Sequence, residues 1–399
     1  MKNFLRVAAL LVALLVGSNQ LLASDAANKI QRLDGSQITA TELDARIKSI
    51  TEAAQVHGLA IAVFNENKPV YTRAFGYADQ PNKKALHFDT EFYGASLSKA
   101  VFAVLVMKLV EQNVIDLDQP LQSYLEEPLW KNRGGDWHEN LADLEQEPRY
   151  KNITARMCLS HTTGLPNWRW FEPDHKLRLH FTPGERYLYS GEGMVLLQIV
   201  LEKLTGKGLE QLAQELVFAP YKMSMSSYRW QAPFEKDYAL GHNAQGETYP
   251  KDKDNSPRAP STLETTPTDY VRFMTAVLQQ KGLSKSSWQE IFSPQIRIRS
   301  RTQFGPGANE QTDAFDHLQI SYGLGWGLLQ TPRGIAAFKE AHGDGFQHYT
   351  IIFPKQGIGV MLMSNSDNAE SAFGYLLEAS IADHYTPLKW QGYIPFDQR

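Results

Sequence analysis

The chain has 399 residues, of which 42% are hydrophobic and 21% are charged. This balance supports a large buried core and excludes a disordered chain. The formal net charge of −4 leaves no basic face for a phosphate backbone, so we expect no nucleic-acid partner and favour a small molecule or a short peptide as the ligand.

The first 23 residues have the pattern of a signal peptide. Two basic residues precede an unbroken apolar run over residues 7–16, and Ala23 offers a small residue for cleavage. A membrane-spanning helix needs about 20 predominantly apolar residues, and polar residues 18–20 interrupt this run. We therefore expect cleavage after the signal, no stable membrane insertion afterwards, and a periplasmic or secreted domain over residues 24–399.

The expected elements begin with a helix around residues 43–54. Two β-rich runs follow at 59–64 and 69–77, and the Asn65-Glu66-Asn67 break between them predicts a hairpin turn. The middle of the chain is mostly helical by its apolar periodicity. Helices are expected there at 96–111, 193–204 and 268–279.

The C-terminal part again has strand patterns and ends with a helix. Strands are expected at 322–329, 348–353 and 358–363, and the last helix at about 369–384. We therefore predict an α/β fold of the α+β type. An antiparallel sheet built from both chain ends is flanked by helices, and a helical subdomain occupies approximately residues 115–310. Two polar stretches, 130–149 and 297–316, are expected to be surface loops.

A candidate nucleophile stands at the start of the predicted helix at 96–111. The sequence Gly94-Ala95-Ser96-Leu97-Ser98 is not a Gly-x-Ser-x-Gly elbow, which argues against an α/β-hydrolase. Ser96-Leu97-Ser98-Lys99 is the only Ser-x-x-Lys in the chain. A spacing of three places Ser96 and Lys99 on one helix face, where a desolvated lysine can act as the base for a serine nucleophile. Taken alone, these four residues also fit a serine-capped helix start with a solvated lysine.

Two further segments support the catalytic interpretation. Tyr189 is followed by two small residues on a loop before an apolar helix, so its phenol can be presented to a cleft. The segment His342-Gly343-Asp344-Gly345 precedes a predicted strand, where a donor can bind a substrate oxygen and glycines permit close approach.

These three elements, in this order, resemble the serine β-lactamase and penicillin-binding protein superfamily, and above all its class C β-lactamase-like esterases and peptidases. Residues 159–165, Leu-Ser-His-Thr-Thr-Gly-Leu, are similar to a further segment of the family. The resemblance implies that Ser96 is the nucleophile, Lys99 the lysine of the first motif and Tyr189 the general base. Tyr150-Lys151-Asn152 fits the literal Tyr-x-Asn pattern better, but we interpret it as structural from its position.

The resemblance also implies how the substrate is held. His342 takes the first position of the family's Lys-Thr-Gly or His-x-Gly motif, and the backbone amides of Ser96 and Gly345 would form the oxyanion hole. Gly191 occupies the place of an asparagine that contacts the acylamino group of β-lactams, and Asp344 stands where a glycine is usual. Gly191, together with His342 in place of the usual lysine, argues against β-lactam turnover. Asp344 argues against the carboxylate-binding role of the motif, because it could repel a substrate carboxylate or bind an amine.

The resulting hypothesis is a serine hydrolase that cleaves an ester or amide through a Ser96 acyl-enzyme. The alternatives are a β-lactamase or D-alanyl-D-alanine carboxypeptidase, and a non-catalytic binding protein on the same fold. No cofactor is expected, and no metal is expected because the histidines lack metal-ligand spacing. The lone cysteine, Cys158, has no partner for an internal disulfide. His161 is interpreted as structural. Trp168, Trp170 and Phe171 fit either a pocket wall or the core.

Overall fold

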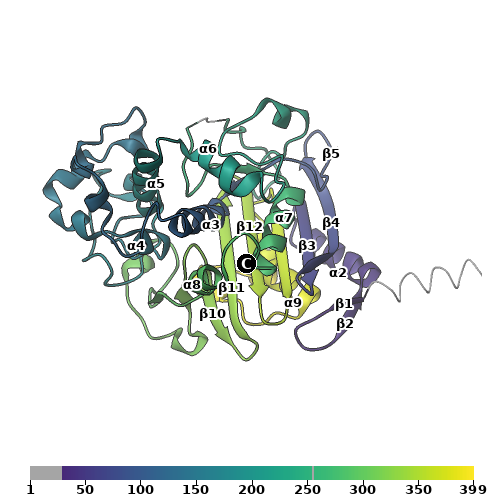
Figure 1. The fold of residues 1–399 in the computed structure, drawn as a ribbon. Coiled ribbons are helices and arrows are strands. Elements are labelled where there is room, and N and C mark those ends of the chain that lie inside the picture. Colours follow the sequence, from purple (N-terminus) through teal and green to yellow (C-terminus); the bar gives the residue numbers. More distant parts are fainter. Residues whose placement is uncertain (1–28, 254–255) are drawn as a thin grey trace, which may run out of the picture.

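The computed structural model describes residues 29–253 and 256–399 and is organised around one nine-stranded antiparallel sheet. Its strands are β3 (Gly58–Asn65), β4 (Lys68–Asp79), β5 (Lys84–Ala85), β8 (Ile296–Arg297), β9 (Ser321–Tyr322), β10 (Gly327–Thr331), β11 (Gly334–Gly343), β12 (Phe346–Phe353) and β13 (Ile358–Ser364). The order across the sheet is β5-β4-β3-β13-β12-β11-β10-β9-β8. Strands from the two chain ends therefore meet in one sheet, as the purple and yellow strands of Figure 1 show. Within it, Leu59 of β3 lies opposite Ser364 of β13.

Helices cover both faces of this sheet. They are α2 (Ala40–Ala53), α3 (Ser98–Glu111), α4 (Ala155–Leu159), α5 (Gly191–Thr205), α6 (Leu209–Ala213), α7 (Pro267–Leu278), α8 (Lys285–Ile291), α9 (Glu370–Ile381) and α10 (Leu388–Gln391). Alternation along β3 sends Leu59, Ile61 and Val63 into the core shared with α2 and α9. Ala60 and Ala62 face the second core, which contains α3 and α7. A strand covered on both faces is apolar at nearly every position.

Two small ribbons complete the architecture. β1 (Lys29–Gln31) pairs with β2 (Gln37–Thr39), and β6 (Phe92–Ala95) pairs with β7 (Leu263–Thr265). The predicted fold class, an antiparallel sheet from both chain ends with helices around it, is confirmed. None of the helices in the described ranges is long and apolar enough to cross a membrane. The predicted signal peptide lies outside the described residues.

Three details differ from the sequence-based expectations. Helix α3 begins at Ser98, so Ser96 lies in the turn before the helix. The strand expected at 322–329 is divided into β9 and β10, because Gly325 has a positive φ of 78° that a strand cannot accommodate. Strand β11 was not expected, since alanines and charged residues are depleted in strands.

Candidate active site

Ser96 lies in a tight turn between β6 and α3. Ala95, just before it, has a left-handed φ of 44°, which costs a non-glycine residue about 1–3 kcal/mol and needs support from its surroundings. Ser98 provides that support. Its hydroxyl donates to the carbonyl of Ala95 and accepts from the backbone amide of Leu263 at 3.1 Å, which ties the turn to β7. These two contacts hold the backbone turn that carries Ser96.

Lys99 is completely buried and reaches Ser96. Its Nζ lies 2.8 Å from Ser96 Oγ and donates a second hydrogen bond, 2.9 Å long, to the carbonyl of Pro260. Burial and the positive charge of Lys339 hold the pKa of Lys99 well below its usual value, whereas Glu340 acts in the opposite direction. A neutral amine beside a serine hydroxyl is a competent proton acceptor.

Tyr189 approaches the same hydroxyl from the loop before α5. Burial and the negative charge of Glu340 raise the pKa of its phenol well above the usual value, and a hydrogen bond with Ser96 acts against this rise. The Nζ of Lys99 lies 4.8 Å from the centre of the Tyr189 ring. Ser96, Lys99 and Tyr189, which the sequence singled out separately, are therefore brought together in one place.

His161 supports Tyr189 rather than facing Ser96. Its ring packs against the Tyr189 ring at 4.3 Å between centres. Its Nδ1 accepts a 3.1 Å hydrogen bond from the amide of Ser190, and its Nε2 lies 3.2 Å from the hydroxyl of Tyr322. With both ring nitrogens engaged and the ring buried, His161 orients the tyrosine loop.

Lys339 is a site residue that the sequence analysis missed. It belongs to β11, it is fully buried, and its Nζ lies 3.2 Å from the hydroxyl of Tyr189. The same ammonium donates to Glu340 Oε1 at 2.7 Å and to the Glu340 carbonyl at 3.0 Å. No motif containing Lys339 was recognisable, and the only available signal was a pair of charged residues inside an otherwise apolar run.

A cavity of about 670 Å³ opens onto Ser96 and Tyr189. Its apolar walls are Pro166, Trp168, Phe171, Leu188, Phe304 and Pro306, and its polar groups come from Asn167, Glu172, His180, Gln303, Asn309 and His342. Trp168 and Phe171 thus line the pocket, whereas Trp170 is not among the lining residues and is half-exposed. No lysine or arginine lines this cavity in the described part of the chain.

The segment around residues 297–316, expected to be a surface loop, forms one wall of this cavity. Gln303 is buried, and Phe304 packs edge-on against the Tyr189 ring with 5.0 Å between ring centres. The polar composition of the segment concealed these two inward-facing side chains. The expectation of a purely surface loop was therefore wrong at this point.

His342 lies at the cavity wall, near the end of β11. Its Nδ1 contacts the carboxylate of Glu370, and its Nε2 lies 3.4 Å from the hydroxyl of Tyr393. The next residue, Gly343, must be small, because a Cβ there would come within 2.5 Å of the Tyr93 ring. Strand β11 therefore passes close to β6, which carries the nucleophile turn.

Gly345 lies in the turn between β11 and β12 and has a φ of 73°. A Cβ at this position would clash with the backbone of Gly241 and His242. Gly345 is not among the described residues that line the cavity, so its role in an oxyanion hole with the amide of Ser96 stays a prediction. Asp344 occupies the same two-residue turn.

Gly191 is the first residue of α5, and its amide donates to Asn167 at both the carbonyl and the side-chain oxygen, 3.0 and 3.1 Å away. A Cβ at Gly191 would meet the Asn167 carbonyl at 2.8 Å and the Trp168 ring at 2.9 Å. No larger side chain fits at 191 without displacing the residues that form the cavity wall. Asn167, rather than residue 191, carries an amide side chain at this wall.

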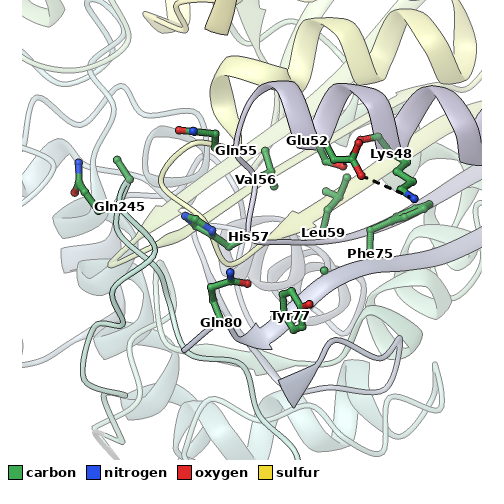
Figure 2. A pocket seen from close by; sticks show the side chains of 13 residues that line it. Lys48, Glu52, Gln55, Val56, His57, Leu59, Phe75, Tyr77, Gln80 and Gln245 are labelled. Carbon is green, nitrogen blue, oxygen red and sulfur yellow. Dashed lines mark hydrogen bonds and ion pairs between the residues drawn. The ribbon is translucent and has the colours of Figure 1, made fainter. Parts of the chain in front are cut away.

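Figure 2 shows a second cavity, of about 760 Å³, beside α2, β3 and β4. It is lined among others by Lys48, Glu52 and His57, and Lys48 and Glu52 form an ion pair across its edge. Neither a serine nor a cysteine is among its lining residues. The larger cavity therefore lacks the nucleophile that defines the smaller one.

Three potential metal ligands lie together at a distance from Ser96 along the chain: Asp136, His138 and Glu139. His138 is buried, and its Nδ1 has no hydrogen-bond partner among the described residues. Burial and the positive charges of Arg258 and Arg169 lower the pKa of His138, whereas the carboxylates of Glu139 and Asp136 act in the opposite direction. We assign this cluster no function.

The two candidate tyrosines occupy different surroundings. Tyr150 is buried in the apolar core, outside the cavity lining, and its hydroxyl has no hydrogen-bond partner in the described ranges. Tyr189→Phe removes only the hydroxyl that meets Ser96, so we expect kcat to fall by about 10²–10⁴-fold, the usual contribution of one positioned acid–base group.

Tyr150→Phe is the matched control, because it makes the same chemical change in the core, and we expect normal kinetics from it. Steady-state rates of both variants on one p-nitrophenyl ester provide the measurement. An inactive Tyr150→Phe beside a fully active Tyr189→Phe would show that the literal Tyr-x-Asn motif supplies the base.

Comparison with known proteins identifies the family of this chain. The model of the Beta-lactamase family matches residues 43–382. The chain belongs to the Beta-lactamase family. The superfamily predicted from the sequence is thereby confirmed, and membership supports serine hydrolase activity in general.

Relatives of this family member differ widely in sequence. "Penicillin-binding protein 4*" of Bacillus subtilis is 26% identical over 324 residues, which cover 73% of this chain and 63% of that protein. "Protein flp" of Staphylococcus aureus is 21% identical over 346 residues, covering 81% of this chain and 62% of that protein. The alignments thus span less than two thirds of these relatives.

Solved structures show the same fold. The octameric penicillin-binding protein homologue from Pyrococcus abyssi gives a TM-score of 0.66 at 19% identity, over 85% of this chain and 76% of that chain. The D-alanine carboxypeptidase AmpC from Burkholderia cenocepacia gives 0.65 at 17% identity, over 85% of this chain and 98% of that chain. At these identities the likeness establishes the fold alone.

Proposed function

We propose that this protein is an exported serine hydrolase that cleaves esters or amides through an acyl-enzyme on Ser96. The observation that carries the proposal is the meeting of the Ser96 hydroxyl with Lys99 Nζ at 2.8 Å and with the Tyr189 phenol in one cavity. The pattern of residues 1–23 supports export to the periplasm or the cell exterior.

The reaction consists of two acyl transfers. Ser96 Oγ attacks the substrate carbonyl carbon while its proton passes to Lys99 and Tyr189, which act together as the base. Collapse of the tetrahedral species breaks the bond to the leaving group, which takes the proton. Water then attacks the acyl-enzyme carbonyl and gives its proton to the same base, which passes it to Ser96 Oγ as the bond between Ser96 and the acid breaks. Backbone amides of the nucleophile turn and of the β11 end, which we assign to Ser96 and Gly345, would stabilise the oxyanion.

The cavity favours an uncharged substrate. Its walls are largely aromatic and aliphatic, which suits an apolar acyl or alcohol group. Of the two histidines at the wall, His180 is engaged by Glu172, which also pairs with Arg178, and His342 is engaged by Glu370. A substrate carboxylate, such as that of a β-lactam or a peptide ending in D-alanine, would therefore find no free cation among the described lining residues. This favours ester hydrolysis over the β-lactamase and carboxypeptidase alternatives.

Two matched p-nitrophenyl esters test the substrate class: the butyrate and the hemisuccinate, which carries a carboxylate at the acyl end. We expect kcat/KM for the neutral ester to be higher by about tenfold or more, corresponding to ~1.4 kcal/mol. We also expect nitrocefin to be turned over far more slowly than the butyrate. Faster turnover of nitrocefin would favour a β-lactamase, and a preference for the hemisuccinate would disprove an uncharged substrate.

The non-catalytic alternative is tested separately. A fluorophosphonate probe should label the wild-type chain at Ser96, as located by peptide mass measurement, because phosphonylation requires an activated serine. A chain that remains unlabelled and hydrolyses no ester would favour a binding protein on this fold.

A further inference from the structure

A buried ion pair adjoins the candidate active site, and none of the recognised motifs contains it. Lys339 and Glu340 are both fully buried, with 2.7 Å between Lys339 Nζ and Glu340 Oε1. Isolated charges are expensive to bury, and even a paired lysine and glutamate rarely improve stability over apolar residues. Such a pair inside β11 therefore requires an explanation other than folding stability.

The contacts of Lys339 indicate what the pair does. Its Nζ lies 3.2 Å from the Tyr189 hydroxyl and 5.1 Å from the centre of the Tyr189 ring. Lys99 Nζ lies 4.8 Å from the same ring. Tyr189 is thus flanked by two buried lysines, one in contact with Ser96 and one in contact with its own hydroxyl.

Glu340 restricts how Lys339 can act. It accepts two of the lysine's hydrogen bonds, one at the carboxylate and one at the backbone carbonyl, so the third is directed to Tyr189. An ammonium has three donors and no acceptor, and these three contacts use all of them. The lysine therefore donates to the phenol oxygen of Tyr189, and Ser96 and Glu340 are the other side chains that hydrogen-bond with this hydroxyl.

We propose that Lys339 is a positioning residue of the active site, which holds the Tyr189 phenol in the orientation that serves Ser96, and that Glu340 holds Lys339 in place. This inference rests on the proposed serine hydrolase function. It assigns to β11 a cation that lies three residues before the His342 segment and acts on Tyr189 rather than on the substrate.

The electrostatic surroundings give the proposal a second readout. The charge of Lys339 lowers the pKa of Lys99, and the charge of Glu340 raises it. The other titratable groups around this pair come from several elements. They are His161, Tyr187, Tyr189, Tyr322, Tyr349 and Tyr393. Removing Lys339 while Glu340 remains should raise the pKa of Lys99, so that the neutral amine of Lys99 forms only at higher pH.

The experiment compares Lys339→Met with the double variant Lys339→Met/Glu340→Gln. In the single variant we expect kcat/KM on a p-nitrophenyl ester to fall on the order of 10²-fold from misplacement of the tyrosine, and the acidic limb of its pH profile to move to higher pH. The double variant leaves no unpaired buried charge. We expect its acidic limb to return close to that of the wild type, while the loss in kcat/KM persists because Tyr189 still lacks its donor.

The control is the buried pair Lys251–Glu264, with 2.6 Å between Nζ and Oε1. The variant Lys251→Met/Glu264→Gln makes the same change outside the catalytic groups and should keep the wild-type pH profile. Wild-type kcat/KM in the folded double variant at 339 and 340 would overturn the proposal, as would an unmoved acidic limb in a folded Lys339→Met. Circular dichroism establishes that each variant is folded.

Fluorophosphonate labelling distinguishes this failure from failure of the proposed function. A wild-type chain that labels at Ser96, beside Lys339 variants that label at the same rate, contradicts the role of Lys339 and leaves the hydrolase assignment intact. A wild-type chain that never labels overturns the hydrolase assignment itself and this inference with it.

Discussion

Replacing Ser96 by alanine is expected to abolish ester hydrolysis while the fold remains intact. The hydroxyl is the proposed nucleophile, and removal of a nucleophile from a catalytic unit lowers kcat on the order of 10⁴–10⁶-fold. The Ser96 hydroxyl hydrogen-bonds with Lys99 and Tyr189 and borders an open cavity, so little packing is lost. Steady-state kinetics and mass measurement of the acyl-enzyme on one p-nitrophenyl ester check the result.

The matched control for this variant is two residues away. Ser98→Ala removes a buried hydroxyl that holds the nucleophile turn to β7. We expect it to lower the free energy of unfolding by about 1–3 kcal/mol, since the Leu263 amide is left unsatisfied, while Ser96 can still be labelled. If Ser96→Ala retained wild-type turnover, the acyl-enzyme mechanism would be wrong.

Lys99→Met is the second variant with a large expected effect. Methionine fills nearly the same space but cannot accept the serine proton, so we expect kcat/KM to fall by about 10³–10⁴-fold. The same change removes a buried amine whose hydrogen bonds go to Ser96 and Pro260 and not to a carboxylate. We therefore expect the Tm to stay unchanged or to rise, because the desolvation cost of the lysine disappears.

Lys108→Met provides the comparison on the same helix. Its Nζ donates to the carbonyl of Gly282 at the protein surface, far from the reaction, so both activity and Tm should remain near wild type. A Lys99→Met protein with almost normal turnover would show that another group takes the proton from Ser96. A marked drop in its Tm would show that Lys99 is held for stability instead.

The sequence predicted those elements whose local patterns agree with their place in the fold. The apolar runs that become β3, β12 and β13 are recognisable because sheet faces and helices enclose them on both sides. The hairpin between β3 and β4 was predicted from its turn residues, of which Glu66 and Asn67 adopt positive φ angles. The three motif residues of the candidate site were also found in the sequence, and their roles remain proposals.

The sequence did not predict β11, and the reason is physical. The run Ala336-Ala337-Phe338-Lys339-Glu340-Ala341 has few β-branched residues and places a charge pair in the strand interior. Lys339 is tolerated there because Glu340 pairs with it and Tyr189, distant in sequence, completes its hydrogen bonding. A contact between residues so far apart leaves no local signal. Functional sites are where local rules are broken, as the position of this pair illustrates.

The inward-facing positions of Phe304 and Gln303 were not predicted for a related reason. They are single inward-facing residues within a polar segment. Phe304 packs against Tyr189, which is distant in sequence, so the segment itself carries no pattern that predicts the contact. The same holds for Ala95, whose left-handed backbone is imposed by the pairing of β6 with β7. Alanine has no local preference for that conformation. A pattern-based prediction therefore places Ser96 in the first turn of a regular helix.

The pairing of β3 with β13 has a consequence for how the molecule folds. Leu59 finds its partner strand only at Ser364, so the centre of the sheet cannot close until nearly the whole chain has been synthesised. Non-local pairing of this kind raises the contact order and slows folding, and the open edge of β3 is exposed to misassembly in the meantime. A delay of this kind would suit the export that we propose, because a polypeptide that cannot complete its sheet early remains available for translocation.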